Sequence, residues 1–254
     1  MKRFLFPLAI GTLTLAACAE LAQVAQQVGA TAATTAASTA ANGGKLSVAE
    51  ITSGLKEALV IGATKSALQA ATKGGYSDNK RLFIPFPAEA QKVKSTLLQL
   101  GMTKQINDFE QALNRAAEEA AKEAKPIVVD AIKSMTVQDA VGILQGDSTA
   151  ATEYLRRTTT KGLTNAFKPK VQAATAKVNL TSYWTPITTA YNKVAPFAGK
   201  QSVNTDLDAY VTQKAIDGLF VLIGDEEKNI RKDPKARVTS LLQRVFGNIY
   251  NVAK

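Results

Sequence analysis

The sequence predicts an all-α protein, and two observations carry the prediction. Apolar residues recur at three- and four-residue spacing along most of the chain from Ser47 onward, as they do on one face of a helix. Segments that alternate apolar and polar residues, the pattern of half-buried strands, are nearly absent. We therefore expect a single compact domain of about 8–10 helices over residues 46–254.

Helix caps and breakers divide the first half of this domain. Ser47 and Glu50 are spaced as a capping box, which begins a helix that Gly74 and Gly75 end. Residues 80–87 are expected to be extended, because residues before proline avoid the α region. Further helices are expected over about 88–100, onward from 103, and from 136 to 146. Pro126 either begins a new helix or kinks the one from 103.

Prolines and polar caps divide the second half. Asp147 or Ser148 caps a helix that is expected to end at Pro169, since proline interrupts the hydrogen bonds of a helix. Thr205 or Asp206 caps a long helix to about residue 232. Its apolar residues occupy more than one side between 206 and 224, which predicts a central helix. Shorter helices are expected over residues 170–178, 182–194 and 237–246.

The N-terminus is typical of a bacterial lipoprotein. Two basic residues precede a short apolar run, and the small residues Ala16 and Ala17 lead to Cys18, the only cysteine. This pattern resembles a lipobox, which implies cleavage of residues 1–17 and lipid attachment at Cys18. An ordinary secretory signal, cleaved at the same small residues, is the alternative. The apolar run of about 12 residues is shorter than the roughly 17–25 that a membrane-spanning helix needs.

Residues 18–45, rich in Ala, Thr and Gln, are predicted to be a tether between the lipid and the helical domain. As flexible coil they would span about 28 Å. Ala19 rather than aspartate follows the cysteine, which resembles the sorting pattern for the outer membrane. The predicted location is the periplasmic side of the bacterial envelope, with a soluble periplasmic or secreted protein as the alternative.

Positive charge is concentrated in one segment. Of 31 basic residues, 29 remain without Lys2 and Arg3, against 21 acidic ones, a net charge of +8. No Asp or Glu occurs between Tyr154 and Thr205, whereas the rest of the chain balances. Such a segment attracts anions and is a candidate binding surface. The alternative is a solvated helix face whose charge is balanced by acidic residues from elsewhere in the chain. The candidate anion-binding residues are Arg156, Arg157, Lys161, Lys168, Lys170 and Lys177.

The partners that suit this segment are those of the envelope. For an exported protein, anionic lipid, lipopolysaccharide or peptidoglycan is a better match than nucleic acid, and a membrane contact through the lipid anchor is expected in any case. Four aromatic residues in the segment suit either a membrane interface or ordinary core packing: Tyr183, Trp184, Tyr191 and Phe197.

The composition removes the commonest catalytic groups. There is no histidine, so Ser-His and Cys-His nucleophiles and the commonest metal ligand are absent. Neither a phosphate-binding loop nor a calcium-loop spacing occurs. Adjacent glutamates at 118–119 and 226–227 point about 100° apart on a helix, unlike a glycosidase pair. We therefore expect no cofactor and no metal, and catalysis would depend on lysine or carboxylates.

Polar residues on apolar helix faces form the second candidate site. Lys214 lies between two apolar stripes of the 206–224 helix, so it must pair, extend to solvent or lose its proton. Asn114 and Glu118 are one helical turn apart on an earlier helix. The predicted buried polar cluster comprises Asn114, Arg115, Glu118, Tyr210, Lys214 and Asp217.

Ordered blocks of residues give the chain a family resemblance. The blocks are IPFP at 84–87, NRAAE at 114–118, ILQG at 143–146, AATEY at 150–154, LDAYV at 207–211 and KAIDGLF at 214–220. In this order they resemble the bacterial family catalogued as domain of unknown function 4197, from residue 48 to 247. Leu155 stands where an aromatic often follows the tyrosine. The resemblance implies an exported helical protein and brings no established activity, so no catalytic residue is carried over.

Three functional hypotheses follow. The first is a lipid-anchored, non-catalytic binding or scaffolding protein that turns residues 154–205 toward an anionic envelope component. The second is a carrier that holds an apolar ligand between helices, suggested by the apolar 206–224 helix. The third is a histidine-free hydrolase that uses Lys214 or carboxylates around Glu118.

Overall fold

The computed structural model describes residues 46–99 and 101–177 continuously, and parts of the chain from 184 to 245. Those parts are residues 184, 188–189, 191–193, 195–199, 202, 206–233, 239–241 and 243–245. The predicted signal sequence, Cys18 and the tether lie outside the described residues, as does much of the helices predicted over 182–194 and 237–246.

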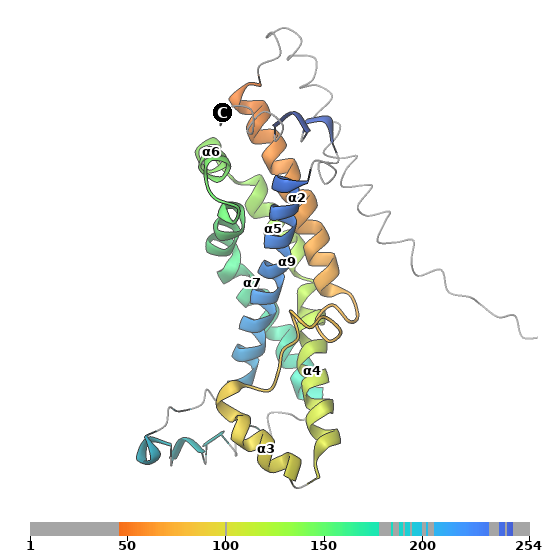
Figure 1. The fold of residues 1–254 in the computed structure, drawn as a ribbon, viewed down its shortest axis with the longest axis vertical. Coiled ribbons are helices and arrows are strands. Elements are labelled where there is room, and N and C mark those ends of the chain that lie inside the picture. The colour runs from red at the N-terminus through yellow and green to blue at the C-terminus, as the bar shows by residue number, and fades with distance from the viewer. Residues whose placement is uncertain are drawn as a thin grey trace, which may run out of the picture.

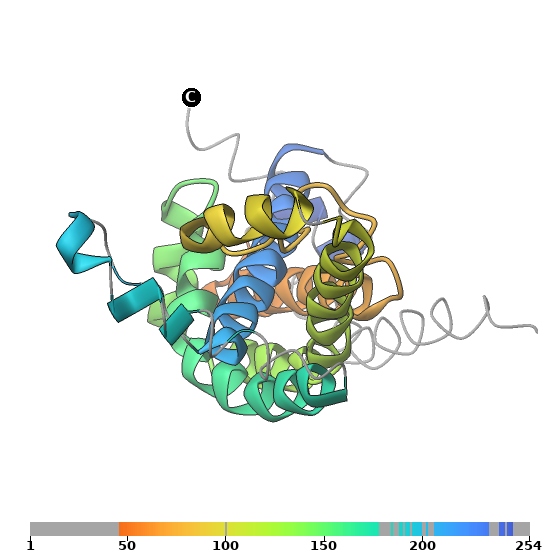
Figure 2. The ribbon, with the colours of Figure 1, turned by 90° about the horizontal axis from the view of Figure 1, so that it is seen from below.

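The described residues form helices and no strand, as the sequence predicts. The longer helices pack along the bundle's length (Figure 1): α2 (Val48–Ala71), α4 (Thr103–Ala121), α5 (Ala124–Lys133), α7 (Ala150–Lys177) and α9 (Leu207–Lys232). In Figure 2, seen along the bundle, α2, α4 and α7 surround α9, and all three contact it. The apolar helix predicted over 206–224 is therefore central.

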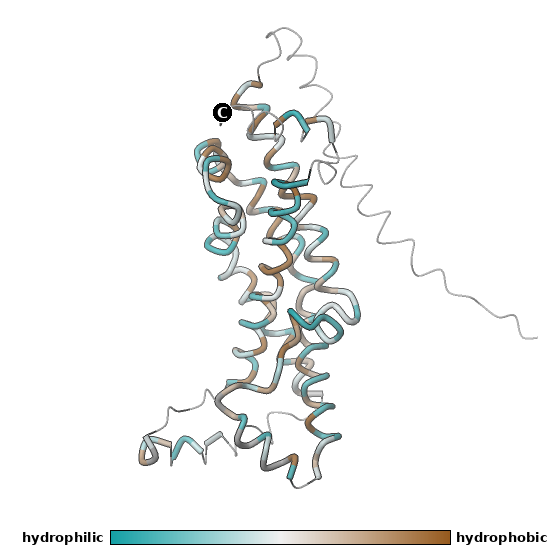
Figure 3. The backbone as a smooth tube through the Cα atoms, in the orientation of Figure 1, coloured by the Kyte–Doolittle hydropathy of each residue, from teal (hydrophilic) through white to brown (hydrophobic). Residues whose placement is uncertain are grey.

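Shorter elements close the two ends of the bundle. η2 (Ala88–Ala90) and α3 (Gln91–Gln99) cross one end, and α6 (Val137–Gln145) lies at the other (Figure 1). η3 (Pro196–Ala198) belongs to a segment that projects beside α3. Apolar positions follow the bundle along its whole length rather than gathering at one end (Figure 3).

Three predicted helix starts are confirmed by side-chain hydrogen bonds, whereas α7 begins at Ala150 and the predicted cap Asp147 binds Thr149 instead of the helix. Ser47 and Glu50 complete the capping box of α2, and Thr136 completes one for α6. Asp206 caps α9 by accepting a hydrogen bond from the third residue of the helix. α3 ends just before Gly101, whose φ of 77° lies in the region that glycine alone adopts without strain.

The prediction that a helix ends at Pro169 is wrong. α7 continues through this proline to Lys177, so the helix expected over 170–178 is the last part of α7. Phe167 and Val171 flank the proline and are fully buried. Their packing holds the apolar face of α7 in place and outweighs the cost of about 3 kcal/mol that an interior proline carries.

The chain between α2 and η2 lies against α4 and α9. Tyr76 is fully buried there, and its hydroxyl donates a hydrogen bond to the carbonyl oxygen of Ala215 on α9. The ring fits against Gly218, where a Cβ atom would lie 2.6 Å from Cε1 of the tyrosine. Burial, followed by the nearby charges of Asp217 and Glu118, raises the pKa of Tyr76, so this hydroxyl stays a hydrogen-bond donor.

Replacing Gly218 with alanine is expected to lower the free energy of unfolding by about 1–3 kcal/mol, because the buried Tyr76 ring has no room to withdraw. Gly142→Ala is the control, since a Cβ at this exposed position of α6 meets nothing within 4 Å. Its stability should stay unchanged or rise by up to about 1 kcal/mol. Urea unfolding followed by circular dichroism compares the two variants, and equal stabilities would contradict the packing of Tyr76.

Candidate functional site

The predicted polar cluster does not form as one buried group. Two members are buried, two are half-buried and two are exposed: Asn114 and Glu118, Tyr210 and Asp217, and Arg115 and Lys214, respectively. Arg115 is displaced by about 100° from its buried neighbours on α4 and so faces solvent. Lys214 extends outward with Nζ 5.9 Å from the ring centre of Tyr210. The expectation that these two cations are buried is wrong, since both side chains reach solvent.

The buried members belong instead to a row of three polar side chains on successive turns of α4. Glu110, Asn114 and Glu118 are spaced by four residues and bind the backbone of residues 74–86; we call them the α4 ladder. At one end, Oε1 of Glu118 accepts hydrogen bonds from three backbone amides. The donors are the N–H groups of Gly74, Tyr76 and Ser77, at 3.1, 3.1 and 2.9 Å.

The other two rungs hold residues 84–86 of the same loop. Residues 80–82, predicted to be extended, form a turn instead. Asn114 accepts from the N–H of Ile84 at 2.8 Å and donates to its carbonyl oxygen at 3.0 Å. Glu110 accepts from the N–H of Phe86 at 2.9 Å and pairs with Lys94 at 2.6 Å. The ladder thus supplies partners for backbone groups that no helix or sheet satisfies. Since amides fill Oε1 of Glu118, this carboxylate serves as a structural acceptor.

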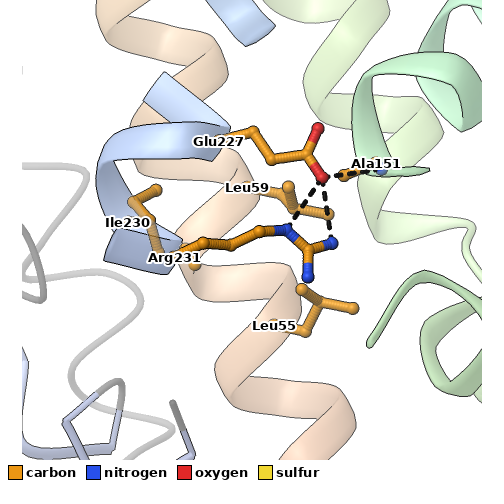
Figure 4. A pocket seen from close by; sticks show the side chains of 7 residues that line it. Leu55, Leu59, Ala151, Glu227, Ile230 and Arg231 are labelled. Atoms are coloured by element: carbon orange, nitrogen blue, oxygen red, sulfur yellow. Dashed lines mark hydrogen bonds and ion pairs between the residues drawn. The ribbon is translucent and has the colours of Figure 1, made fainter. Parts of the chain in front are cut away.

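A second buried carboxylate, Glu227 of α9, lies against the first turn of α7 (Figure 4). Its oxygens accept from the backbone amides of Ala151 at 3.0 Å and Thr152 at 2.8 Å, and from the hydroxyl of Thr152 at 2.7 Å. Arg231 completes the site with an ion pair to Glu227 at 2.9 Å and a hydrogen bond to the carbonyl oxygen of Ile143. Negative charge at a helix N-terminus is favourable, and here it joins α9 to α7.

A small cavity beside this pair has a volume of about 10 Å³, and Leu55, Leu59 and Ile230 are among the residues that line it (Figure 4). A volume of this size holds about one water molecule. It offers no room for an apolar ligand, so this cavity gives the carrier hypothesis no support.

The candidate anion-binding residues separate into paired and exposed cations. Arg156 is half-buried: it pairs with Asp217 at 3.1 Å and lies 4.5 Å from the ring centre of Phe220. Lys170 pairs with Glu123 at 3.0 Å, and this hydrogen bond raises the pKa of the lysine. Acidic residues from other elements therefore balance part of the segment, as the alternative interpretation held. The side chain of Lys177 lies outside the described residues.

Three exposed cations among the described candidates lie on one side of α7, whereas Lys170, also exposed, lies on the opposite side. Arg157, Lys161 and Lys168 follow helical spacing; we call them the α7 basic stripe. Lys168 lies 3.7 Å from Asp206, and both side chains are about half exposed, so solvent screens this pair. The stripe extends over about 16 Å of helix. Among the described candidate residues, it is the group of cations that lies together on one exposed side of the helix.

The aromatic residues of the same segment divide between the two interpretations. Trp184 is buried with its ring centre 5.7 Å from that of Phe86 and 6.2 Å from that of Phe109, so it is a core residue. Tyr191 is partly buried against the core. Phe197 is 93 % exposed. Tyr183 lies outside the described residues.

Sequence reasoning missed Glu110 and Glu227 as structural acceptors. Glu110 had a detectable signal, because it precedes Asn114 and Glu118 at the same four-residue spacing. Glu227 had none, since its main partners are backbone amides about 75 residues earlier in the chain.

The described parts of the chain hold neither a metal-binding cluster nor a membrane-spanning helix. There, no group of three or more His, Cys, Asp or Glu side chains is placed to hold a metal ion. No helix within those parts combines the length and apolar character that crossing a membrane requires.

Comparison with known proteins gives one match. The sequence model of a family described as "Protein of unknown function (DUF4197)" matches residues 45–247. Neither the comparison with curated proteins nor the comparison with solved structures finds a match.

Proposed function

The chain belongs to the DUF4197 family, and from this premise we propose that it is a lipid-anchored, non-catalytic binding protein of the bacterial envelope. Cys18 carries the lipid, and residues 19–45 tether the helical domain. The domain presents the α7 basic stripe to an anionic envelope surface. The observation that carries this proposal is the exposure of Arg157, Lys161 and Lys168 on one side of α7, within a segment that contains no Asp or Glu.

The placement of the carboxylates and of Lys214 supports a non-catalytic role. Glu118 and Glu227 are buried and accept hydrogen bonds from backbone amides. Lys214 is exposed on α9 beside Tyr210. A hydrolase that used Lys214 with Glu118 would need the two groups to converge in an open pocket. The structure places one at the surface and the other beneath the 74–86 loop.

Electrostatics sets the expected strength of the contact. A basic residue close to an anionic bilayer contributes about 1 kcal/mol, so the three residues of the stripe together contribute about 3 kcal/mol at low salt. This corresponds to about a hundredfold in binding constant. The effect falls off within a Debye length of about 10 Å at 0.1 M salt, so the stripe must lie close to the surface that it binds.

Neutralising the stripe is expected to weaken binding to vesicles that contain phosphatidylglycerol by about 30- to 100-fold. The test uses the chain from residue 18 with Cys18→Ser, so that no acyl chain holds it on every vesicle. The variant is R157Q/K161Q/K168Q, and co-sedimentation measures its binding. Lipopolysaccharide micelles and peptidoglycan sacculi form parallel arms, which identify the anionic component that the stripe favours.

The matched control is K73Q/K80Q/K232Q, which removes the same charge from three exposed lysines outside α7. We expect this control to lose less than about fivefold in binding, because only the net charge changes. Unchanged binding of the stripe variant to all three anionic components, or an equal loss in both variants, would contradict the proposal.

A further inference from the structure

Phe197 is exposed to an extent that packing in the bundle does not explain. The residue is 93 % exposed, whereas the other large apolar residues described as exposed, Val48, Leu98 and Val137, are 40–54 % exposed. It is the central residue of η3, a single turn that begins with Pro196. Water therefore surrounds nearly the whole ring, and the protein forgoes the free energy that burying a phenylalanine ring would contribute.

The turn that carries Phe197 restricts its position. Pro196 fixes its own φ at the start of η3, and Gly199 ends the turn in the left-handed region with φ of 64°. The N–H of Gly199 donates to the carbonyl oxygen of Pro196 at 3.1 Å. A Cβ atom built at Gly199 meets nothing within 4 Å, so the space beside the turn is open. The ring is presented outward on a defined turn.

The charge around Phe197 indicates the kind of surface that would cover it. Lys193 precedes η3 by one helical turn and is exposed. The sequence from Tyr154 to Thr205 contains basic residues and no acidic one. An exposed aromatic ring beside an exposed lysine, Lys193, is complementary to an anionic bilayer, in which the ring enters the boundary below the headgroups while the lysine contacts phosphate. A purely apolar protein groove would offer Lys193 no anionic partner.

The position of η3 gives this contact a geometric role. The described chain begins with α2 at one end of the bundle, and the segment that carries η3 projects at the opposite end (Figure 1). In Figure 2 the same segment extends beyond the outline of the packed helices. α2 alone is about 36 Å long. An attachment through the N-terminal tether alone would therefore not bind the η3 end of the bundle to the membrane.

We propose that Phe197 is a second membrane contact, which enters the interface of an anionic phospholipid bilayer at the end of the bundle remote from α2. This inference rests on the proposed function, because it takes the anionic surface to be a membrane. Together, the tether and Phe197 hold the bundle along the bilayer rather than upright on its tether.

Fluorescence quenching by brominated lipid tests the insertion directly. The chain from residue 18 with Cys18→Ser and Phe197→Trp is mixed with phosphatidylglycerol vesicles whose acyl chains carry bromine. We expect a blue shift and at least twofold quenching of the emission from the introduced indole, measured as the difference from the parent chain, whose Trp184 is buried. Val137→Trp is the control, since Val137 is 51 % exposed on α6 at the other end of the bundle. Absence of quenching for Phe197→Trp, or equal quenching in both variants, would overturn the inference.

Truncation of the ring separates this inference from the proposed function. Phe197→Ala is expected to weaken vesicle binding about tenfold, while Phe197→Leu retains most of it and Val137→Ala leaves it unchanged. If Phe197→Ala binds like the parent while R157Q/K161Q/K168Q does not, the membrane contact of Phe197 is refuted and the contact of the α7 basic stripe is supported. If only Phe197→Ala loses binding, the contact of the α7 basic stripe is refuted and the insertion of Phe197 is supported.

Discussion

Replacing Glu118 with alanine is expected to lower the free energy of unfolding by about 3–5 kcal/mol. One carboxylate oxygen accepts hydrogen bonds from three backbone amides, those of Gly74, Tyr76 and Ser77. Each bond to a charged group is worth about 1.5–3 kcal/mol, and relaxation of the loop recovers part of the sum. Chemical denaturation measures the loss. Hydrogen exchange at the three amides should accelerate together, because they share one acceptor.

The adjacent glutamate provides a matched control for this prediction. Glu119 is exposed and pairs with Lys122, also exposed, the residue that follows the end of α4. Glu119→Ala should change stability by less than about 0.5 kcal/mol, as is usual for surface ion pairs. If Glu118→Ala proves too unstable to fold, Glu118→Gln retains one amide oxygen as acceptor and should give an intermediate loss. Equal effects at positions 118 and 119 would contradict the role of the α4 ladder.

Replacing Glu227 with alanine is expected to cost about 3–5 kcal/mol for a different reason. The substitution removes the acceptor of two amides at the start of α7 and the ion pair of Glu227 with Arg231. The side chain of Arg231 is only 14 % exposed, so its charge is poorly solvated once the carboxylate is gone. Removing one partner of a buried pair is costly because the other charge stays buried.

A double-mutant cycle distinguishes the ion pair from the helix cap. The double variant Glu227→Ala/Arg231→Met lacks the buried positive charge. We expect its free energy of unfolding to be about 1–2 kcal/mol higher than that of Glu227→Ala. Glu226→Ala is the surface control, because Glu226 pairs with the half-exposed Lys65 at 2.7 Å. That control should lose less than about 1 kcal/mol. A loss at 226 that equals the loss at 227 would contradict the assignment.

The sequence predicted the helices well where local chemistry decides them. Ser47, Thr136 and Asp206 begin their helices as the caps indicate, since capping depends on residues within one turn. Pro169 misled the prediction, because the packing of Phe167 and Val171 on neighbouring helices decides whether α7 continues. Such packing between distant elements has no local signature in the sequence.

The candidate sites were predicted in part for a related reason. The spacing of Asn114 and Glu118 showed that two polar side chains share a face of α4, but their partners are backbone groups of a separate loop. Backbone groups are the same at every residue, so the sequence does not mark which ones a buried carboxylate will meet. The charge block was visible as a run, whereas its division into paired and exposed cations depends on Asp217 and Glu123 from other elements.

The salt dependence of vesicle binding tests the central claim, the contact of the α7 basic stripe with an anionic surface, most directly. The Cys18→Ser chain and its R157Q/K161Q/K168Q variant are titrated onto phosphatidylglycerol vesicles from about 50 to about 200 mM salt, where screening changes strongly. The stripe predicts a steep loss of binding for the parent and a clearly shallower slope for the variant. Equal binding constants and an equal salt dependence for the parent and the variant would contradict this claim.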